Sequence, residues 1–213
     1  MLALMFNTIE AGAKWPKDLK VARAAFMSKG AGKYDDPLNH RVLTILPVPY
    51  RRWAIARLYT LKPWISNWDF PQVCAGGIGK GAQDGWYRTA TQLEHHELND
   101  RWYTGGAIDI RKCFDQMPRT QLYTLAKKTG MPQQVLQTYM QYQEELKTYN
   151  TVQGGLGQPY SKRCGIPQGD PLSMMMVALY LRPWVQYMET EFEVTARVLA
   201  EDMLIIAHGA DHI

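Results

Sequence analysis

Asp109 and the acidic pair Glu201-Asp202 are the residues of this 213-residue chain whose chemistry can be inferred most directly. Asp109 follows the short stretch Gly105-Gly106-Ala107-Ile108, and the pair stands far along the chain between two apolar runs. Carboxylates from distant segments supply the oxygen ligands that hard divalent cations prefer. Two such cations, about 3.5–4 Å apart, clamp the attacking and leaving oxygens in phosphoryl transfer. These acids are therefore candidate ligands of a two-metal site.

The pair has a simpler alternative, a solvated turn. Strands over 194–200 and 203–207 predict a hairpin with only Glu201-Asp202 between them. Two-residue turns favour Asn-Gly or Asp-Gly because both positions need positive φ, so Glu-Asp is a poor turn sequence. Asp109 taken alone has its own alternative, an acid at a helix N-terminus. Spacing to other motifs must decide between these interpretations.

The elements that position the acids follow from hydrophobic periodicity and from glycine and proline punctuation. The second half of the chain alternates between strand and helix patterns. The expected elements are a buried strand over 105–110, a helix from Pro118 to Gly130, a helix over about 132–149, a hairpin within 148–164, and a helix over 171–192. The last helix is apolar nearly all round in its first half, which predicts burial on more than one side.

Composition is that of a globular protein, with 46% hydrophobic and 21% charged residues. The net charge of +4 permits a nucleic-acid partner but argues for one only weakly. Three widely spaced cysteines favour neither a disulfide framework nor a zinc site, which indicates a reducing compartment, nuclear or cytoplasmic. No apolar run has the roughly 18 residues of a membrane span, and the apolar start lacks the basic region of a signal peptide. It is expected to begin a buried helix in a protein that is not secreted.

Three segments resemble reverse transcriptase motifs, in the family's order. Residues 108–117 read IDIRKCFDQM and resemble motif A, residues 165–173 read GIPQGDPLS and match motif B, and residues 199–203 read LAEDM where motif C, usually YADDL, belongs. Upstream, segments around 15–47 and 76–97 resemble fingers motifs. The chain is thus similar to the reverse transcriptase domain of non-LTR retrotransposons and group II introns, over roughly residues 15–208.

The resemblance implies an α+β fold, the right-hand polymerase palm, in which a ferredoxin-like antiparallel sheet is backed by helices. Residues 1–104 are expected to be a fingers-like region, and residues 105–213 a palm-like region that carries motifs A, B and C in one reverse transcriptase domain. Little sequence follows motif C, so the thumb is expected to be absent.

The implied activity is RNA-directed DNA polymerisation by two-metal nucleotidyl transfer to a primer 3′-OH. Asp109, Glu201 and Asp202 are then the catalytic acids and, with the carbonyl of Ile110, the ligands of Mg²⁺ or Mn²⁺. The implied partners are an RNA template, a DNA primer and deoxynucleoside triphosphates, and the implied setting is a longer polyprotein.

Further residues carry expected binding roles. The nucleotide-binding candidates are Phe114, Gln168, Lys29 and Arg41, and the template or primer candidates are Gly169, Arg51, Arg52 and Lys80. Phe114 stands where the family has an aromatic residue that excludes a ribose 2′-OH, which favours DNA synthesis. Its alternative is a phenylalanine buried behind a strand, that of the Gln168 turn a structural turn, and that of the basic residues scattered surface charge. His95-His96 is expected to face solvent.

Glu201 departs from the family, which has aspartate there as a direct ligand. One added methylene displaces a carboxylate by roughly 1–1.5 Å, whereas Mg²⁺ demands near-ideal octahedral geometry. Activity is therefore expected to be impaired, absent or shifted toward Mn²⁺. A catalytically impaired or repurposed copy that binds nucleic acid without synthesis is the main alternative function. An RNA-dependent RNA polymerase is disfavoured by Phe114 and by the Pro-Gln-Gly sequence.

Overall fold

The computed structural model describes residues 1–30, 36, 39–152 and 154–209. The chain forms two compact units, each built from two stretches: Met1–Leu61 with Phe114–Ser173 (unit 1), and Lys62–Cys113 with Met174–Ile213 (unit 2). This division differs from the single boundary expected between residues 104 and 105. The reason is that strands on both sides of that boundary pair within one sheet, and such pairing cannot be read from local composition.

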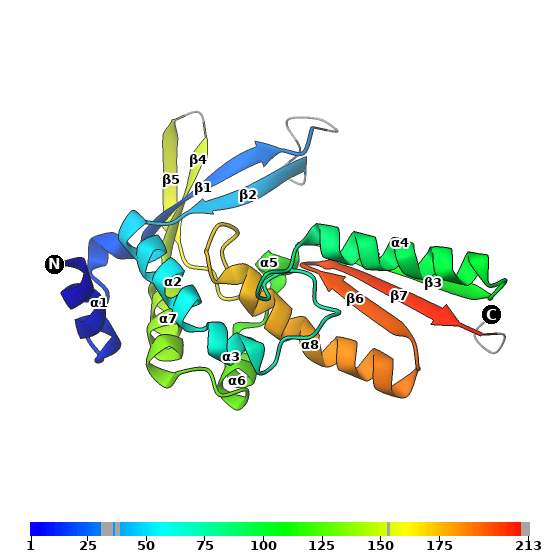
Figure 1. Ribbon diagram of the computed structural model, residues 1–213. Helices are drawn as coiled ribbons and strands as arrows, with labels where there is room; N and C mark the ends of the chain where they lie inside the picture. The colour runs from blue at the N-terminus through cyan, green and yellow to red at the C-terminus, as the bar shows by residue number, and fades with distance from the viewer. Residues whose placement is uncertain (31–35, 37–38, 153, 210–213) are drawn as a thin grey trace. The chain divides into compact units, whose positions relative to one another are not determined.

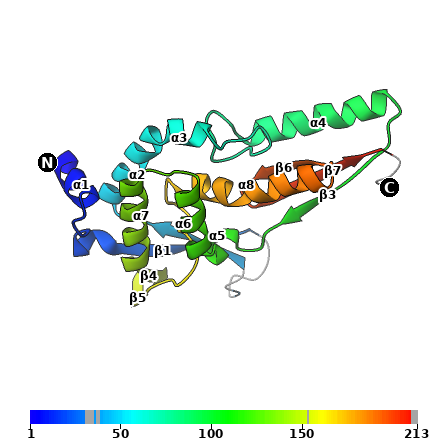
Figure 2. The same ribbon diagram turned by 90° about the horizontal axis from the view of Figure 1, so that it is seen from below.

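Unit 1 combines helices with a four-stranded sheet (Figure 1). Its elements are α1 (Leu2–Glu10), a short 3-10 helix (Lys17–Lys20), β1 (Val21–Ser28), β2 (His40–Ile45), α2 (Val48–Thr60), α6 (Arg119–Lys128), α7 (Gln133–Glu145), β4 (Lys147–Val152) and β5 (Gly155–Tyr160). The short helix α5 (Cys113–Gln116) leads into it. Helices α6 and α7 lie side by side, as Figure 2 shows.

The sheet of unit 1 has the order β2-β1-β4-β5, in which β1 and β4 are parallel and the other pairs antiparallel. One face is buried at Ala22, Ala24 and Thr148. Alternation between protein interior and solvent is clearest at the start of β1, whereas β5 is exposed along nearly its whole length.

An aromatic cluster lies in the core of unit 1. Trp15 is 1% exposed and its ring contacts those of Tyr50, Trp53 and Tyr142. Tyr50 and Tyr142 stack with ring centroids 3.5 Å apart. Each such pair contributes about 0.5–1.5 kcal/mol beyond the area it buries, so α2 and α7 are fixed against each other.

Two expectations for unit 1 need correction. The helix expected over 132–149 ends at Glu145, because residues 147–152 pair as β4 with both β1 and β5. The apolar start is helical but not buried: Leu2 and Leu4 of α1 are 48% and 73% exposed. The hairpin expected within 148–164 is confirmed by β4 and β5.

Unit 2 contains a three-stranded antiparallel sheet with the order β3-β7-β6 (Figure 1). Its elements are α3 (Lys62–Ser66), α4 (Ala82–Leu98), β3 (Tyr103–Asp109), α8 (Ser173–Glu191, in this unit from Met174 on), β6 (Thr195–Leu199) and β7 (Asp202–His208). Helix α4 packs on β6, where Arg197 donates hydrogen bonds to Thr89 and Gln92. The α+β fold with helix-backed sheets is therefore as expected.

Strand β3 forms where the sequence predicts it, but it is not buried. It is an edge strand of the sheet, and Thr104 to Asp109 are all exposed. Gly105 and Gly106 bring no side chains to cover either face, and a Cβ at Gly105 would meet the Ile205 carbonyl oxygen at 2.6 Å. By contrast, α8 is buried as predicted over most of its first half, including Met175 to Leu179. Among the described residues no helix is long and apolar enough to cross a membrane.

Candidate active site

Asp109 and Asp202 lie directly opposite each other in the ladder between β3 and β7. Directly opposed residues in an antiparallel pair project from the same face, with Cα atoms about 4.5–5.5 Å apart. Both side chains are exposed. The sheet thus brings two carboxylates from distant parts of the sequence to one solvent-facing position.

The hairpin turn is shifted by one residue from the predicted position. Asp202 pairs with Leu199 as the first residue of β7, so the turn consists of Ala200 and Glu201. Ala200 has a positive φ of 55°, which a turn of this kind requires at its first position. The two acids are therefore not equivalent: Asp202 belongs to the strand and Glu201 to the turn.

Glu201 is joined to the segment after Asp109 through its backbone. The Ile110 amide donates a hydrogen bond to the Glu201 carbonyl oxygen at 3.2 Å. The carbonyl of Ile110, the expected metal ligand, accepts a hydrogen bond from the Cys113 amide at 3.1 Å and keeps a second lone pair. The turn after β3 and the tip of the β6–β7 hairpin are thus tied together.

The donor set fits one hard cation better than it fits a closed metal site. In the part of the chain that the structure describes, no group of three or more His, Cys, Asp and Glu side chains stands close enough to hold a metal ion. Mg²⁺ is commonly held by one or two carboxylates, with water and substrate phosphates completing its octahedron. Asp109 and Asp202 match that pattern, whereas Glu201 does not complete a third ligand.

The pKa of the Cys113 thiol is raised by its surroundings, which include the acids of the site. Burial is the largest cause that raises the pKa of this thiol, to about 11, and the charges of Glu201 and Asp109 raise it further. The thiol is therefore neutral at physiological pH. A neutral thiol is a poor nucleophile.

Phe114 is buried, with 7% of its surface exposed. Its carbonyl oxygen accepts a hydrogen bond from the Ile166 amide at 2.7 Å, which joins α5 to the segment of motif B. The neighbouring Asp115 forms an ion pair with Lys162 at 2.7 Å. The position of Phe114 agrees better with the buried alternative than with an open nucleotide contact.

Residues 165–173, the motif B loop, are held closely by backbone contacts. The Thr44 amide donates to the Gln168 carbonyl oxygen at 2.8 Å. Gly169 has a φ of +114°, and a Cβ there would meet the Thr44 carbonyl oxygen at 2.8 Å. Only glycine fits such a position without strain. Gln168 is half-buried and Gly169 exposed, so the turn presents itself to solvent while its backbone is fixed to β2.

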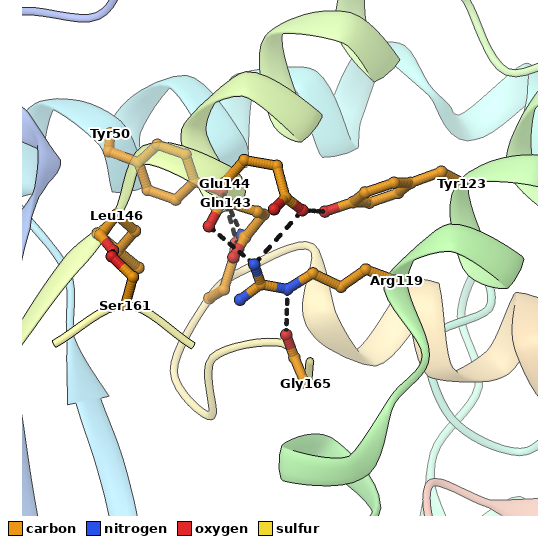
Figure 3. Close-up of polar contacts among 9 residues, drawn as sticks. Tyr50, Arg119, Tyr123, Gln143, Glu144, Leu146, Ser161 and Gly165 are labelled. Atoms are coloured by element: carbon orange, nitrogen blue, oxygen red, sulfur yellow. Dashed lines mark hydrogen bonds and ion pairs between the residues drawn. The ribbon is translucent and has the colours of Figure 1, made fainter. Parts of the chain in front are cut away.

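Arg119 holds the start of this loop (Figure 3). The buried guanidinium donates from Nε to the Gly165 carbonyl oxygen at 2.7 Å and from Nη1 to the Gln143 carbonyl oxygen at 3.0 Å. It also forms an ion pair with Glu144 at 3.4 Å, and Glu144 in turn accepts from the Tyr123 hydroxyl at 3.3 Å. Arg119 thereby connects the loop to the end of α7.

Asp170 holds the other end. Its carboxylate is 5% exposed and accepts hydrogen bonds from the Tyr50 hydroxyl at 2.8 Å, Gln143 Nε2 at 2.9 Å and the Leu172 amide at 3.0 Å. Burial raises the pKa of Asp170 to about 6, although these three hydrogen bonds act in the opposite direction. Among the described residues no cationic side chain forms an ion pair with it, so the three donors are its compensation for lost hydration.

The expected basic contacts fall into two groups. Lys29, Arg41, Arg51 and Arg52 are exposed and belong to unit 1. Lys80 is different, because its ammonium pairs with Asp69 at 2.7 Å and also donates to the Phe70 carbonyl. These contacts fix Lys80 to the segment at Asp69 and Phe70, and its contact to template or primer stays a prediction.

A cavity of about 400 Å³ lies in unit 2 between α4 and the sheet. Its walls are mainly apolar and include Cys74, Trp86 and Leu204, with Arg197 and Asp202 as the charged members.

His96, on helix α4, was expected to face solvent. It is instead 6% exposed and stacks on His208 with ring centroids 4.9 Å apart. The face of α4 toward the sheet decides this, and a short sequence window does not show which face that is.

The sequence motifs indicate no role for Arg119, Asp170 or Arg23. Arg23 lies with Arg41 on the exposed face of the sheet of unit 1, since their partners Ile45 and Met27 are each 53% exposed. A signal for Asp170 was present, namely a lone carboxylate between Gly169 and the proline that precedes an apolar helix. No comparable signal marks Arg119, because its partners are backbone carbonyls.

The chain is similar to known proteins both in its sequence family and in its fold. The family model described as reverse transcriptase (RNA-dependent DNA polymerase) matches residues 32–213. The fold is similar to apo telomerase from Candida tropicalis truncated from the C-terminal domain, with a TM-score of 0.66 and 10% identity over 99% of this chain and 48% of that one. It is also similar to telomerase from Candida albicans in complex with a TWJ fragment of telomeric RNA, with a TM-score of 0.64 and 10% identity over 98% and 41% of the two chains. The chain thus spans about half the length of these telomerases or less. No curated protein matches it in sequence.

Proposed function

Because this chain belongs to the reverse transcriptase (RNA-dependent DNA polymerase) family, we propose that it carries the nucleotidyl-transfer site of an RNA-directed DNA polymerase of a retroelement. The observation that carries the proposal is the pairing of Asp109 with Asp202 across β3 and β7. Two exposed carboxylates on one face of a sheet are a suitable binding site for a divalent cation and the triphosphate it accompanies.

Asp109 and Asp202 are proposed as the ligands of Mg²⁺. The cation supplies charge stabilisation to the reacting phosphate when it is bound. The chain's own part is to hold the two carboxylates at fixed separation, through the ladder of β3 and β7 and the hydrogen bond between Ile110 and Glu201. Two carboxylates held at fixed positions need no reorganisation during the reaction. Such preorganisation is the main source of electrostatic stabilisation of transition states by proteins.

Glu201 is proposed as the weak member of the set. Its side chain leaves from the turn rather than from the strand that carries Asp202, and it is one methylene longer than the aspartate of the family. A carboxylate displaced by roughly 1–1.5 Å meets the strict geometry of Mg²⁺ poorly, whereas Mn²⁺ accepts the same oxygen ligands. We therefore expect activity that is low with Mg²⁺ and higher with Mn²⁺.

Unit 1 is proposed to contact the nucleotide and the template and primer strands. Phosphate contacts of this kind come from arginine and lysine side chains and from backbone N–H groups. The candidates for the nucleotide are Gln168, Lys29 and Arg41, and those for template and primer are Gly169, Arg51 and Arg52. Sugar selection by Phe114 remains a proposal that its burial makes less direct.

A second function has an observation in its favour. Glu201 and the two-carboxylate set are also what a copy that binds nucleic acid without synthesis would show. Primer extension on RNA and DNA templates, with Mg²⁺ and with Mn²⁺, separates the two functions when it is combined with filter binding of the same primer–template. Incorporation that Asp109→Ala abolishes supports the polymerase. Tight binding without incorporation, in a protein shown to be folded, supports the binding function.

A further inference from the structure

Residues 165–173, the motif B loop, are anchored at both ends to the same residue of α7, Gln143. The start is held through Arg119, which donates to the Gly165 carbonyl and to the Gln143 carbonyl. The far end is held through the side chain of Gln143, whose Nε2 donates to Asp170 at 2.9 Å. Gln143 therefore takes part in both anchors, once by its backbone and once by its side chain.

The anchors are buried and depend on charge. Arg119, Gln143 and Asp170 are 5%, 1% and 5% exposed. Hydrogen bonds that involve a charged group are roughly twice as strong as neutral ones, and a buried group that loses its partner incurs the full desolvation penalty. The loop therefore has one strongly preferred backbone path rather than several of similar energy.

The exposed part of the loop is the turn at Gln168-Gly169, which lies between the two anchors. The donors to Asp170 come from α2 through Tyr50, from α7 through Gln143, and from the loop itself through Leu172. In addition, the Asp170 carbonyl accepts from the Ser173 amide at 3.0 Å, and Ser173 Oγ donates to the Pro167 carbonyl at 2.9 Å. The Asp170 amide also donates to the Pro167 carbonyl at 3.2 Å, across the turn. The contacts of Asp170 and Ser173 thus close and fix the turn whose more exposed residues are Gln168 and Gly169.

We propose that Asp170 is a positioning residue, which acts with Arg119 through Gln143 to preset the Gln168-Gly169 turn for the incoming nucleotide. The proposal rests on the proposed function for the identity of the ligand. The presetting itself does not depend on catalysis. It predicts that removal of a donor to Asp170 loosens the turn while the remainder of unit 1 stays folded.

Two conservative variants test the proposal. Tyr50→Phe removes one hydroxyl donor and leaves the ring that stacks on Tyr142. Asp170→Asn keeps the shape but offers one acceptor oxygen and one donor group where three donors converge. Leu122→Ala is the control, because Leu122 is 0% exposed in the same unit and makes none of these hydrogen bonds.

Hydrogen exchange of the Thr44 amide, which donates to the Gln168 carbonyl, is the first readout. We expect both variants to accelerate it by about tenfold to a hundredfold, the loss that one hydrogen bond to a charged group produces, with α6 and α7 unchanged. Leu122→Ala is expected to accelerate exchange across the unit instead. A Thr44 amide that stays protected in Asp170→Asn, or that opens only together with α6 and α7, would overturn the proposal.

The second readout is the Michaelis constant for dTTP on a poly(rA)–oligo(dT) primer–template. Presetting of the turn predicts that Tyr50→Phe and Asp170→Asn raise KM about tenfold, with a smaller change in kcat. An unchanged KM in variants whose turn has loosened would also overturn it. If the wild-type protein incorporates no nucleotide, the proposed function fails, while the exchange result still decides whether Asp170 presets the turn.

Discussion

Asp109 and Asp202 occupy opposed positions on neighbouring antiparallel strands, so one ladder sets the distance between two carboxylates that are far apart in sequence. Opposed like charges destabilise a strand pair when no cation lies between them. Repulsion between the two carboxylates therefore destabilises the sheet when no cation is bound, and a bound cation removes this repulsion. Cation binding is expected to raise the thermal stability of the sheet.

Asp109→Asn should remove Mg²⁺-dependent primer extension. A neutral amide cannot replace a carboxylate ligand, and charge stabilisation by a bound cation is worth several kcal/mol, so the rate should fall at least a hundredfold. Glu191→Gln, at an exposed position late in α8, serves as the control and should leave the rate unchanged. Extension that persists in Asp109→Asn would remove this residue from the site.

The stabilising effect of Mg²⁺ gives a test that needs no activity. Thermal unfolding of the wild-type protein should shift to higher temperature as MgCl₂ is added, since a ligand that binds only the folded state stabilises it. Asp109→Asn and Asp202→Asn should each be more stable than wild type without Mg²⁺ and should respond less to it. A response equal to that of wild type in both variants would contradict a cation seat at this pair.

Glu201→Asp should raise the rate with Mg²⁺ and lower the preference for Mn²⁺. The shorter side chain restores the ligand length of the family, and the ratio of the two rates in primer extension is the quantity to measure. Glu201→Gln is the matched control, since it keeps the length and removes the charge. A rate with Mg²⁺ that is unchanged or lower in Glu201→Asp would refute the argument from side-chain length.

Ala200→Gly should stabilise the hairpin by about 1 kcal/mol, because an L-residue with a positive φ carries roughly that strain and glycine does not. Denaturant unfolding measures the gain. Ala207→Gly, within β7, is the opposite control and should destabilise the protein. A loss of stability in Ala200→Gly would show that the turn differs from the one described.

Asp170 should make stability depend on pH in a direction unusual for an aspartate. Its pKa rises from 3.8 to about 6 on folding, so the folded state keeps a proton that the unfolded state has lost. The associated stability is present below about pH 4 and disappears as the pH rises through about 6, a change of at most about 3 kcal/mol. The unfolding free energy of wild type minus that of Asp170→Asn should fall across this range, and a flat difference would contradict the assignment.

The sequence predicted the elements better than their environment. Helices α6 and α8 and strand β3 were recoverable from proline, glycine and periodicity signals. The turn at Ala200-Glu201 was missed by one residue, because its register is set by pairing of Asp202 with Asp109 rather than by turn composition. Such pairing is tertiary information.

The candidate site shows the same limit. Motif spacing was enough to propose Asp109 and Asp202 as partners, and the strand register brings them together. Spacing could not show that Phe114 is buried or that Lys80 is paired with Asp69. Exposure and pairing depend on which face of an element meets its neighbour, and a single sequence leaves that open for short segments.

Strand β3 has a practical consequence for anyone who purifies this protein. Among the described residues it pairs only with β7, so its outer edge offers a row of free amides and carbonyls, and its uncharged stretch over 103–108 lacks the lysines and prolines that protect natural edges. Concentrated samples are therefore expected to associate edge to edge and to lose soluble material. A strand added beside this edge, on the same chain or as a separate peptide, should keep the protein in solution, because its backbone would pair with the free amides and carbonyls.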